Sequence, residues 1–383
     1  MQRVSAIRRS RAAAAVLLTI AVALAPATSA VAVTASFWRM DSFAAAEEGH
    51  VDGTGILHDG RIVLSSEFER IDADGAQYAW AGESVRGGDV VVVAGTPGRV
   101  LLLGDGGTVE LLSMETSDFT AMAVSNSGDI YVGTAPGGEV YVVTTDGESR
   151  LFFETGEGYV WSMAYSEEHG LLVGTGDEAK VYAIDESGSG TVIYESNDSS
   201  VSALASVGDR VLAGTSIDGM LLDITPGSAL RVLSDTSFEE ISGVARGADG
   251  TVYFAATTVS LEDVLDESNG FGSGFGDGAV FRLTPTGSAI ELWHSADAPV
   301  TSLGLSHDGS VLAGTGSGGL VYSMVPDGGA DLLARLDGEE VLSIRGTDDI
   351  IIAVGAPGGV YRMGSGLAES GEYESEVFDA RSH

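Results

Sequence analysis

A short Gly-Thr or Ala-Thr signature recurs along the chain at nearly constant spacing. It ends at Thr96, Thr134, Thr175, Thr215, Thr257 and Thr315, and a related AVGA segment ends at Ala356. The successive steps are 38, 41, 40, 42, 58 and 41 residues. One four-stranded blade has about this length, so the spacing predicts an all-β chain folded as a β-propeller.

Each repeat reads as four short strands. In residues 119–154, the runs FTAMAV, IYVGT, EVYVV and ESRLFFE are separated by turns rich in Gly, Asp, Asn and Pro. Seven four-stranded antiparallel blades are predicted from residue 78 onward, and the last lacks its fourth strand. We expect residues 54–66 to pair with the strand that contains Val360 and Tyr361, which closes the ring. Eight blades is the alternative, if residues 49–77 form a blade of their own.

The first strand of each repeat carries a small residue at one position: Ala81, Ala121, Ser162, Ala203, Gly243, Ser302 and Ser343. Blades converge on the propeller axis, where the innermost strands have least room, so this column predicts the wall of the central channel. The bulky residues that follow, such as Met122 and Leu303, are expected to fill the gaps between sheets. Turn glycines such as Gly147, Gly250 and Gly309 are expected to supply positive φ angles.

The N-terminus has the layout of a secretory signal peptide. Four arginines between residues 3 and 11 precede the apolar run AAAAVLLTIAVALA and small residues that suit cleavage after Ala30 or Ala32. The predicted organisation is a signal peptide at 1–30, a propeller at 35–366 and a C-terminal tail at 367–383. The mature protein is expected in the periplasm or outside the cell, with no membrane insertion after cleavage; an uncleaved membrane anchor is the alternative.

The charge excludes several partner classes. The formal net charge is −37 at pH 7 and there is no cysteine. A field of this sign repels nucleic acid and anionic membranes, and the fold cannot depend on disulfides. We expect a monomer whose ligand is a protein, a peptide or a carbohydrate.

Four segments together resemble a group of exported bacterial propellers of unassigned function, described as WD-repeat-like or quinoprotein-like. The segments are GHVDGTGILHDGRIVL, the YAW and YVW openings at Tyr78 and Tyr159, EISGVARGADGTVYFAAT at 240–257 and GEYESEVFDA at 371–380. The resemblance spans nearly the whole mature chain and implies no catalytic residue. It also implies that the tail is the stub of a further β domain or is used elsewhere.

Two sets of side chains are candidates for the mouth of the channel. Tyr78, Trp80, Tyr159 and Trp161 occupy equivalent places in two first strands, where aromatic rings suit stacking on a ligand or packing between blades. The pairs Glu239–Glu240 and Glu339–Glu340 occupy equivalent connections in two other blades. The interpretations are a ligand or cation site that includes Glu240, or a solvated acidic rim.

Residues 259–277 form an insertion within one repeat. Its carboxylates are weak candidates for binding Ca²⁺: Glu262, Asp263, Asp266, Glu267 and Asp277. Because they lack the ligand spacing of an EF-hand loop, a surface loop is the alternative interpretation.

Sequence patterns of hydrolytic chemistry are absent. The six histidines form no HExxH pair, there is no GxSxG elbow, and cysteine catalysis is impossible. We therefore predict a non-catalytic binding module without a cofactor other than Ca²⁺. The alternative is a Ca²⁺-dependent lactonase or lyase of the gluconolactonase-like propeller type, and a quinone-dependent dehydrogenase is a third option.

Overall fold

The computed structural model describes residues 42–95, 97–197, 199–258, 276–284, 286–296, 298–325 and 329–375. They lie within one compact unit, Met40–Glu376. Among them the single α-helix is α2 (Phe43–Glu47) and almost all other regular structure is antiparallel strand. No helix in these ranges is long and apolar enough to cross a bilayer. The predicted signal peptide lies outside the described residues.

The strands form successive four-stranded meanders joined by short turns. The first three are β5 (Tyr78–Ser84), β6 (Val90–Gly95), β7 (Gly98–Gly104) and β8 (Gly107–Met114); β9 (Asp118–Val124), β10 (Ile130–Ala135), β11 (Glu139–Val143) and β12 (Ser149–Glu154); and β13 (Val160–Ser166), β14 (Gly170–Thr175), β15 (Val181–Ile184) and β16 (Gly190–Tyr194). The next two are β17 (Ser200–Val207), β18 (Arg210–Ser216), β19 (Met220–Asp223) and β20 (Arg231–Asp235); and β21 (Glu240–Arg246), β22 (Val252–Thr257), β23 (Gly278–Leu283) and β24 (Ala289–Ser295).

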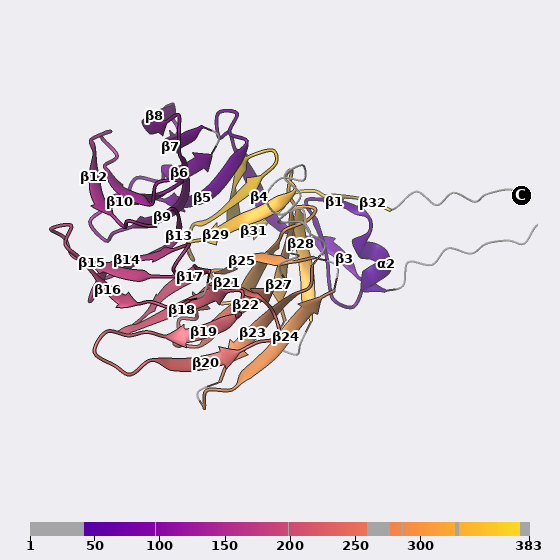
Figure 1. Cartoon of the computed structure of the whole chain (residues 1–383). Coiled ribbons are helices and arrows are strands. Elements are labelled where there is room, and N and C mark those ends of the chain that lie inside the picture. The colour runs from indigo at the N-terminus through magenta and orange to yellow at the C-terminus, as the bar shows by residue number, and fades with distance from the viewer. Residues whose placement is uncertain are drawn as a thin grey trace, which may run out of the picture. The chain divides into compact units, whose positions relative to one another are not determined.

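The last meanders recruit strands from the N-terminal part of the chain. They comprise β25 (Val300–Leu305), β26 (Val311–Thr315), β27 (Leu320–Met324) and β28 (Ala330–Arg335), extended by β2 (Thr54–Ile56) and β3 (Ile62–Leu64); and β29 (Glu340–Arg345), β30 (Ile350–Gly355) and β31 (Gly359–Leu367), extended by β4 (Ser66–Ile71). Figure 1 shows yellow β31 beside indigo β4, two segments that are distant in sequence.

Ring closure uses a different segment from the one predicted. Residues 54–56 pair with β28 and β3, and it is β4 that pairs with β31, through Ile71 opposite Val360 and Arg70 opposite Tyr361. The prediction for residues 54–66 was therefore wrong except at Ser66, which faces Leu367. For β2 the physical reason is burial. Outer strands such as β12 are half exposed, and β4 matches that pattern because two of its glutamates are exposed. Every residue of β2 is buried, so β2 does not have the exposure pattern of an outer strand.

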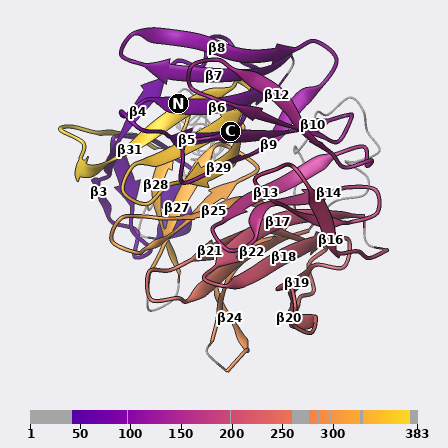
Figure 2. The same cartoon turned by 90° about the vertical axis from the view of Figure 1, so that its left-hand side faces the viewer.

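The first strands of the meanders surround a channel. Neighbours in the series β5, β9, β13, β17, β21, β25 and β29 contact one another, and β29 contacts β5 in turn. In Figure 2 these strands lie in the middle of the view, with β8, β20 and β24 at its margin. All the small residues predicted for the channel wall line this channel. The turn glycines also behave as predicted, because Gly250 and Gly309 each have a φ of +84°.

Each part of the Gly-Thr signature has a structural task. A Cβ on Gly214 would lie 2.6 Å from the Cβ of Ile241, so glycine lets the next first strand pack closely. The following threonine is buried and fixes the loop after it, since the Oγ1 of Thr215 accepts a hydrogen bond from the amide of Met220 at 3.2 Å. In β22 the residue equivalent to Thr215 is Ala256, and not Thr257. The FAAT segment is therefore shifted by one residue from the other repeats.

The described part of the tail pairs with the N-terminal segment. Strand β32 (Glu372–Glu374) is antiparallel to β1 (His50–Asp52), and the hydroxyl of Tyr373 donates a hydrogen bond to the carbonyl of Ala46 at 2.9 Å. Residues 376–383 lie outside the described ranges.

Candidate ligand-binding channel

A β-bulge shapes the wall of the channel at the same point in every first strand. The strand ladder skips one residue at each bulge, and all of these residues line the channel: Trp80, Thr120, Trp161, Ser202, Ser242, Thr301 and Leu342. A bulge redirects a side chain that would otherwise follow the alternation of the strand. The cavity enclosed by these strands measures about 420 Å³.

Hydroxyl groups at or beside the bulges join consecutive first strands. Thr120 donates to the carbonyl of Val160 at 2.6 Å, Ser162 to that of Val201 at 2.7 Å, Ser202 to that of Ile241 at 2.9 Å, Ser242 to that of Val300, and Thr301 to that of Val341 at 2.8 Å. Trp80 and Leu342 cannot make this bond. Ala81, next to Trp80, has no hydroxyl, and Ser343, next to Leu342, forms no such bond, so among the described residues the two junctions of β5 with its neighbours are the ones without it.

Two stacked aromatic pairs lie at one end of the channel. The rings of Tyr78 and Trp80 are 5.6 Å apart with an interplanar angle of 20°, and those of Tyr159 and Trp161 are 5.6 Å apart at 9°. Both tryptophans line the channel. The structure therefore brings the four predicted aromatic residues into two equivalent pairs.

The environments of the two tryptophans differ. Trp80 packs on an apolar cluster shared by the first two meanders, and its indole N–H is buried without a hydrogen-bond partner among the described residues. Trp161 is half-buried, and its indole lies over Gly176. Both tryptophans are half-buried, and Trp80 combines channel lining with packing on that apolar cluster.

The four candidate glutamates do not form a uniform solvated rim. Glu339 is exposed and Glu239 and Glu240 are half-buried, but Glu340 is only 5 % exposed. Burial, with a contribution from Glu339, raises the pKa of Glu340 to about 7. Burial also raises the pKa of Glu240. The hydrogen bond that the Oγ of Ser216 donates to Glu240 over 3.5 Å acts in the opposite direction and is the smaller effect. The interpretation of these glutamates as a solvated acidic rim is therefore wrong for Glu340.

Glu340 lies close to one of the aromatic pairs. The ring of Tyr78 covers Gly355, whose backbone pairs with both Tyr78 and Glu340. The pKa of Tyr78 is raised by burial and by the nearby carboxylates of Glu340 and Glu339. Glu339 therefore places negative charge near the Tyr78–Trp80 stack, and Glu340 adds to it as its carboxyl group ionises around pH 7.

Four of the five sequence-based metal candidates lie outside the described residues. Glu262, Asp263, Asp266 and Glu267 lie outside the described residues, whereas Asp277 is described and lies 3.7 Å from the Nε2 of His294. Within the described ranges no three Asp, Glu or His side chains are grouped as a metal site would require. The titratable side chains that line the channel are Glu83 and Arg345, 3.6 Å apart, and Tyr165.

Sequence reasoning did not find the ring of hydroxyl groups. The sequence does contain a signal for it. In most repeats a Thr or Ser stands either at the small-residue position of the first strand or immediately before it. The bulge that turns these hydroxyls toward the neighbouring strand becomes visible only in the ladder register.

The sequence matches no protein-family model and no curated protein. Solved structures are similar in fold. Virginiamycin B lyase from Staphylococcus aureus, as a catalytically inactive His-to-Ala variant with quinupristin, has a TM-score of 0.64 at 11% identity, covering 78% of this chain and 99% of that one. The WD40 propeller domain of Doa1 has a TM-score of 0.59 at 13% identity, covering 78% and 97%. YCF48 bound to D1 peptide has a TM-score of 0.59 at 12% identity, covering 79% and 98%.

These similarities agree with the expected resemblance to WD-repeat-like and quinoprotein-like propellers. At such low identity they establish the fold and carry no catalytic residue across. The chain is a β-propeller with the architecture shared by WD40 domains and virginiamycin B lyase.

Proposed function

We propose that this protein is an exported seven-bladed propeller that binds a peptide segment at the aromatic end of its channel without catalysing a reaction. Seven blades follow if each first strand begins one blade and β4 completes the last. The eight-blade alternative has less support, because residues 54–71 supply strands to two other sheets. Export rests on the signal-like N-terminus.

The observation that carries the proposal is the placement of Trp80 and Trp161 at bulge positions. The equivalent residues in most other first strands are hydroxyl-bearing and bond to the neighbouring strand. At the junction of Trp80 no such hydrogen bond forms. At the junction of Trp161 the neighbouring residue, Ser162, makes the bond instead. Large aromatic rings on a channel wall, in place of residues that join the strands, are suited to contact with a ligand.

Charge indicates the class of peptide. The chain has a formal charge of −37, and Glu339 and Glu340 lie beside the Tyr78–Trp80 stack. A Lys or Arg side chain gains from an aromatic face and from nearby carboxylates together. The ligand we propose is therefore a peptide or exposed protein segment with a basic side chain. The YCF48 structure, a propeller of similar fold bound to D1 peptide, supports the choice of a peptide as the ligand.

The lyase alternative has less support from the described channel. A histidine-to-alanine change yields a catalytically inactive virginiamycin B lyase, whereas no histidine is among the residues that line this channel. A lactonase of the gluconolactonase-like type needs several carboxylates converging on the axis, and Glu83 is the only carboxylate among the lining residues.

Peptide selection tests the proposal. The mature protein is used to select from a random peptide display library, and selected peptides are titrated against the parent, Trp161→Ala and Trp293→Phe. Trp293 is a control outside the channel, since its ring packs against that of Tyr322 at an angle of 37° with the ring centres 4.7 Å apart, and it does not line the channel. We expect basic peptides whose affinity falls about tenfold in Trp161→Ala and is unchanged in Trp293→Phe. Equal binding by Trp161→Ala, or calcium-dependent turnover of lactones, would contradict the proposal.

A further inference from the structure

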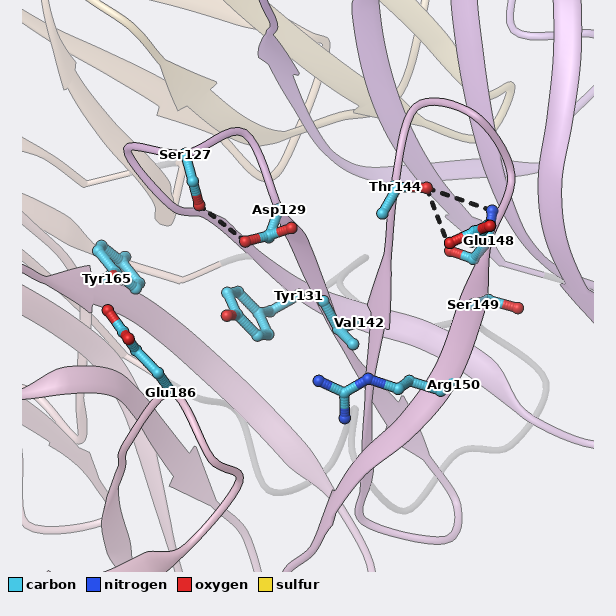
Figure 3. A pocket seen from close by; sticks show the side chains of 10 residues that line it. All are labelled: Ser127, Asp129, Tyr131, Val142, Thr144, Glu148, Ser149, Arg150, Tyr165 and Glu186. Atoms are coloured by element: carbon cyan, nitrogen blue, oxygen red, sulfur yellow. Dashed lines mark hydrogen bonds between the residues drawn. The ribbon is translucent and has the colours of Figure 1, made fainter.

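A larger cavity, of about 740 Å³, opens between the β9–β12 sheet and the β13–β16 sheet (Figure 3). One of its walls is Tyr165 on β13, which also lines the channel. Tyr165 lies near the end of β13 that is remote from Trp161. The cavity is thus a separate site, toward the opposite end of the channel from the two Tyr–Trp pairs.

The cavity is lined by a tyrosine whose hydroxyl has no hydrogen-bond partner among the described residues. Among the described residues four tyrosines are buried, and three have a hydrogen bond at the hydroxyl: Tyr182 donates to the carbonyl of Thr155 at 2.8 Å, Tyr322 donates to Glu47, and Tyr361 accepts from the amide of Asp337 at 3.0 Å. Tyr131, only 7 % exposed, forms none with any described residue. The hydroxyl of Tyr131 is not among the fully enclosed unpaired polar atoms of the described residues, so it opens onto the cavity and is available to a bound molecule.

Arg150 presents a second unoccupied donor group. Its guanidinium carbon lies 5.1 Å from the ring centre of Phe152, which packs against Tyr131 at 5.0 Å. Figure 3 shows this guanidinium group extending toward Tyr131. Arg150 is exposed and forms no ion pair with a described residue, although three carboxylates line the same cavity. Stacking on Phe152 therefore orients the guanidinium group and leaves its N–H donors free.

Acceptors lie on the other walls of the cavity. Asp129 and Glu148 come from the same sheet as Tyr131, and Glu186 comes from the neighbouring sheet, where Figure 3 shows its carboxylate pointing toward Tyr165. The Tyr131 and Tyr165 rings are nearly parallel, 6.3 Å apart at 8°. Burial, together with Asp129 and Tyr165, raises the pKa of Tyr131, so its hydroxyl remains a hydrogen-bond donor at neutral pH.

The charge and donor pattern narrow the class of ligand. Three carboxylates against one guanidinium group make the cavity net negative, which opposes an anionic ligand. A simple cation would leave the Arg150 and Tyr131 donors without an acceptor. Hydroxyl groups donate and accept, so a neutral polyhydroxylated molecule satisfies the phenols, the guanidinium group and the carboxylates together. The cavity volume is within the range of sites for small ligands.

We propose that the cavity between β10, β12 and β13 is a saccharide-binding site, in which Tyr131 and Arg150 donate hydrogen bonds and Asp129 and Glu186 accept them from sugar hydroxyls. This site is independent of peptide binding at the aromatic end of the channel.

Titration with defined sugars tests the site. Glucose, galactose, N-acetylglucosamine, maltose and cellobiose are titrated calorimetrically into the full mature protein, with lysine and glutamate as charged comparators. At least one sugar should bind with millimolar or tighter affinity. Tyr131→Phe and Arg150→Gln should each weaken that affinity by about five- to tenfold. Trp161→Ala should leave it unchanged, which separates this site from the proposed peptide site.

Tyr182→Phe is the matched control, because it removes a partnered hydroxyl from an equally buried tyrosine outside the cavity. Tyr182→Phe should lower the melting temperature and keep sugar binding, whereas Tyr131→Phe should keep the melting temperature and lose affinity. The proposal is wrong if none of the sugars binds, if Tyr131→Phe binds as tightly as the parent, or if lysine or glutamate binds in preference.

Discussion

The Oγ of Ser202 donates a hydrogen bond to the backbone carbonyl of Ile241, 2.9 Å away, and so joins the first strands of two consecutive meanders across the channel wall. Thr120 and Thr301 occupy the same bulge position and make the same bond. The junctions between these sheets are therefore held by hydrogen bonds at the axis as well as by apolar packing.

Replacing Ser202 tests the contribution of one such bond. Ser202→Ala should lower the free energy of unfolding by about 1 kcal/mol, because the carbonyl of Ile241 loses its donor in a half-buried site. Ser202→Thr is the control, since threonine serves at equivalent positions, and it should restore most of the loss. Urea denaturation measures both; equal stability of Ser202→Ala and the parent would show that the bond is energetically neutral.

The glycine of the repeated signature is predicted to be intolerant of a methyl group. Gly214→Ala places a Cβ 2.6 Å from the Cβ of Ile241 and should destabilise the fold by about 1–3 kcal/mol through overpacking. Gly106→Ala is the matched control, because a Cβ at Gly106 meets nothing within 4 Å. Thermal unfolding compares the two variants, and similar melting temperatures would contradict the close approach.

Two N-terminal truncations distinguish the closing strand from the neighbouring hairpin. A chain beginning at residue 65 loses β2 and β3 but keeps β4, whereas a chain beginning at residue 77 also loses β4. The second should be less stable than the first by about 3 kcal/mol or more, since it exposes the edge of β31 and removes Phe68 from the core. Equal stability would show that β4 does not close the sheet.

The raised pKa of Glu340 makes the stability of the folded protein depend on pH. Its folded-state pKa of about 7 lies above the value for an exposed glutamate, so the folded protein retains a proton that the unfolded chain releases. The associated stability is present below about pH 4.5 and is lost as the pH rises to 7. Glu340→Gln should remove this decline and raise stability at pH 7.5 by about 2 kcal/mol. Denaturation of both proteins across pH 5–8 measures the slopes, and parallel curves would contradict the burial of this carboxylate.

The sequence was sufficient to predict the propeller class and the residues of the channel wall. The regular spacing of Thr134, Thr175 and Thr215 predicted the meanders, because a buried threonine after a closely packed glycine recurs once in each. The small residues of the first strands predicted the axis, because steric room there is limited by geometry alone. Both signals are local and periodic, and they can be read from one chain.

Features that depend on contacts between distant segments were not predictable. Residues 54–66 and 66–71 are both β-prone, and only the strand pairing of the folded chain shows that the second segment lies against β31. Glu339 and Glu340 are the same residue type, but the side chain of Glu339 is exposed and that of Glu340 is buried. The cavity at Tyr131 depends on Arg150 and Tyr165 from two other strands, and the lack of a partner for the Tyr131 hydroxyl has no sequence pattern.

The central claim is that a basic peptide binds at the aromatic end of the channel. Photo-crosslinking tests it directly: a selected peptide carrying benzophenone beside its basic residue is irradiated with the protein, and the attachment points are mapped by mass spectrometry. A peptide bound at the aromatic end of the channel should be attached within residues 78–80, 159–161 and 339–340, and unlabelled peptide should suppress the attachment. Attachment confined to outer strands such as β8, β20 or β24, or spread evenly over the surface, would contradict it.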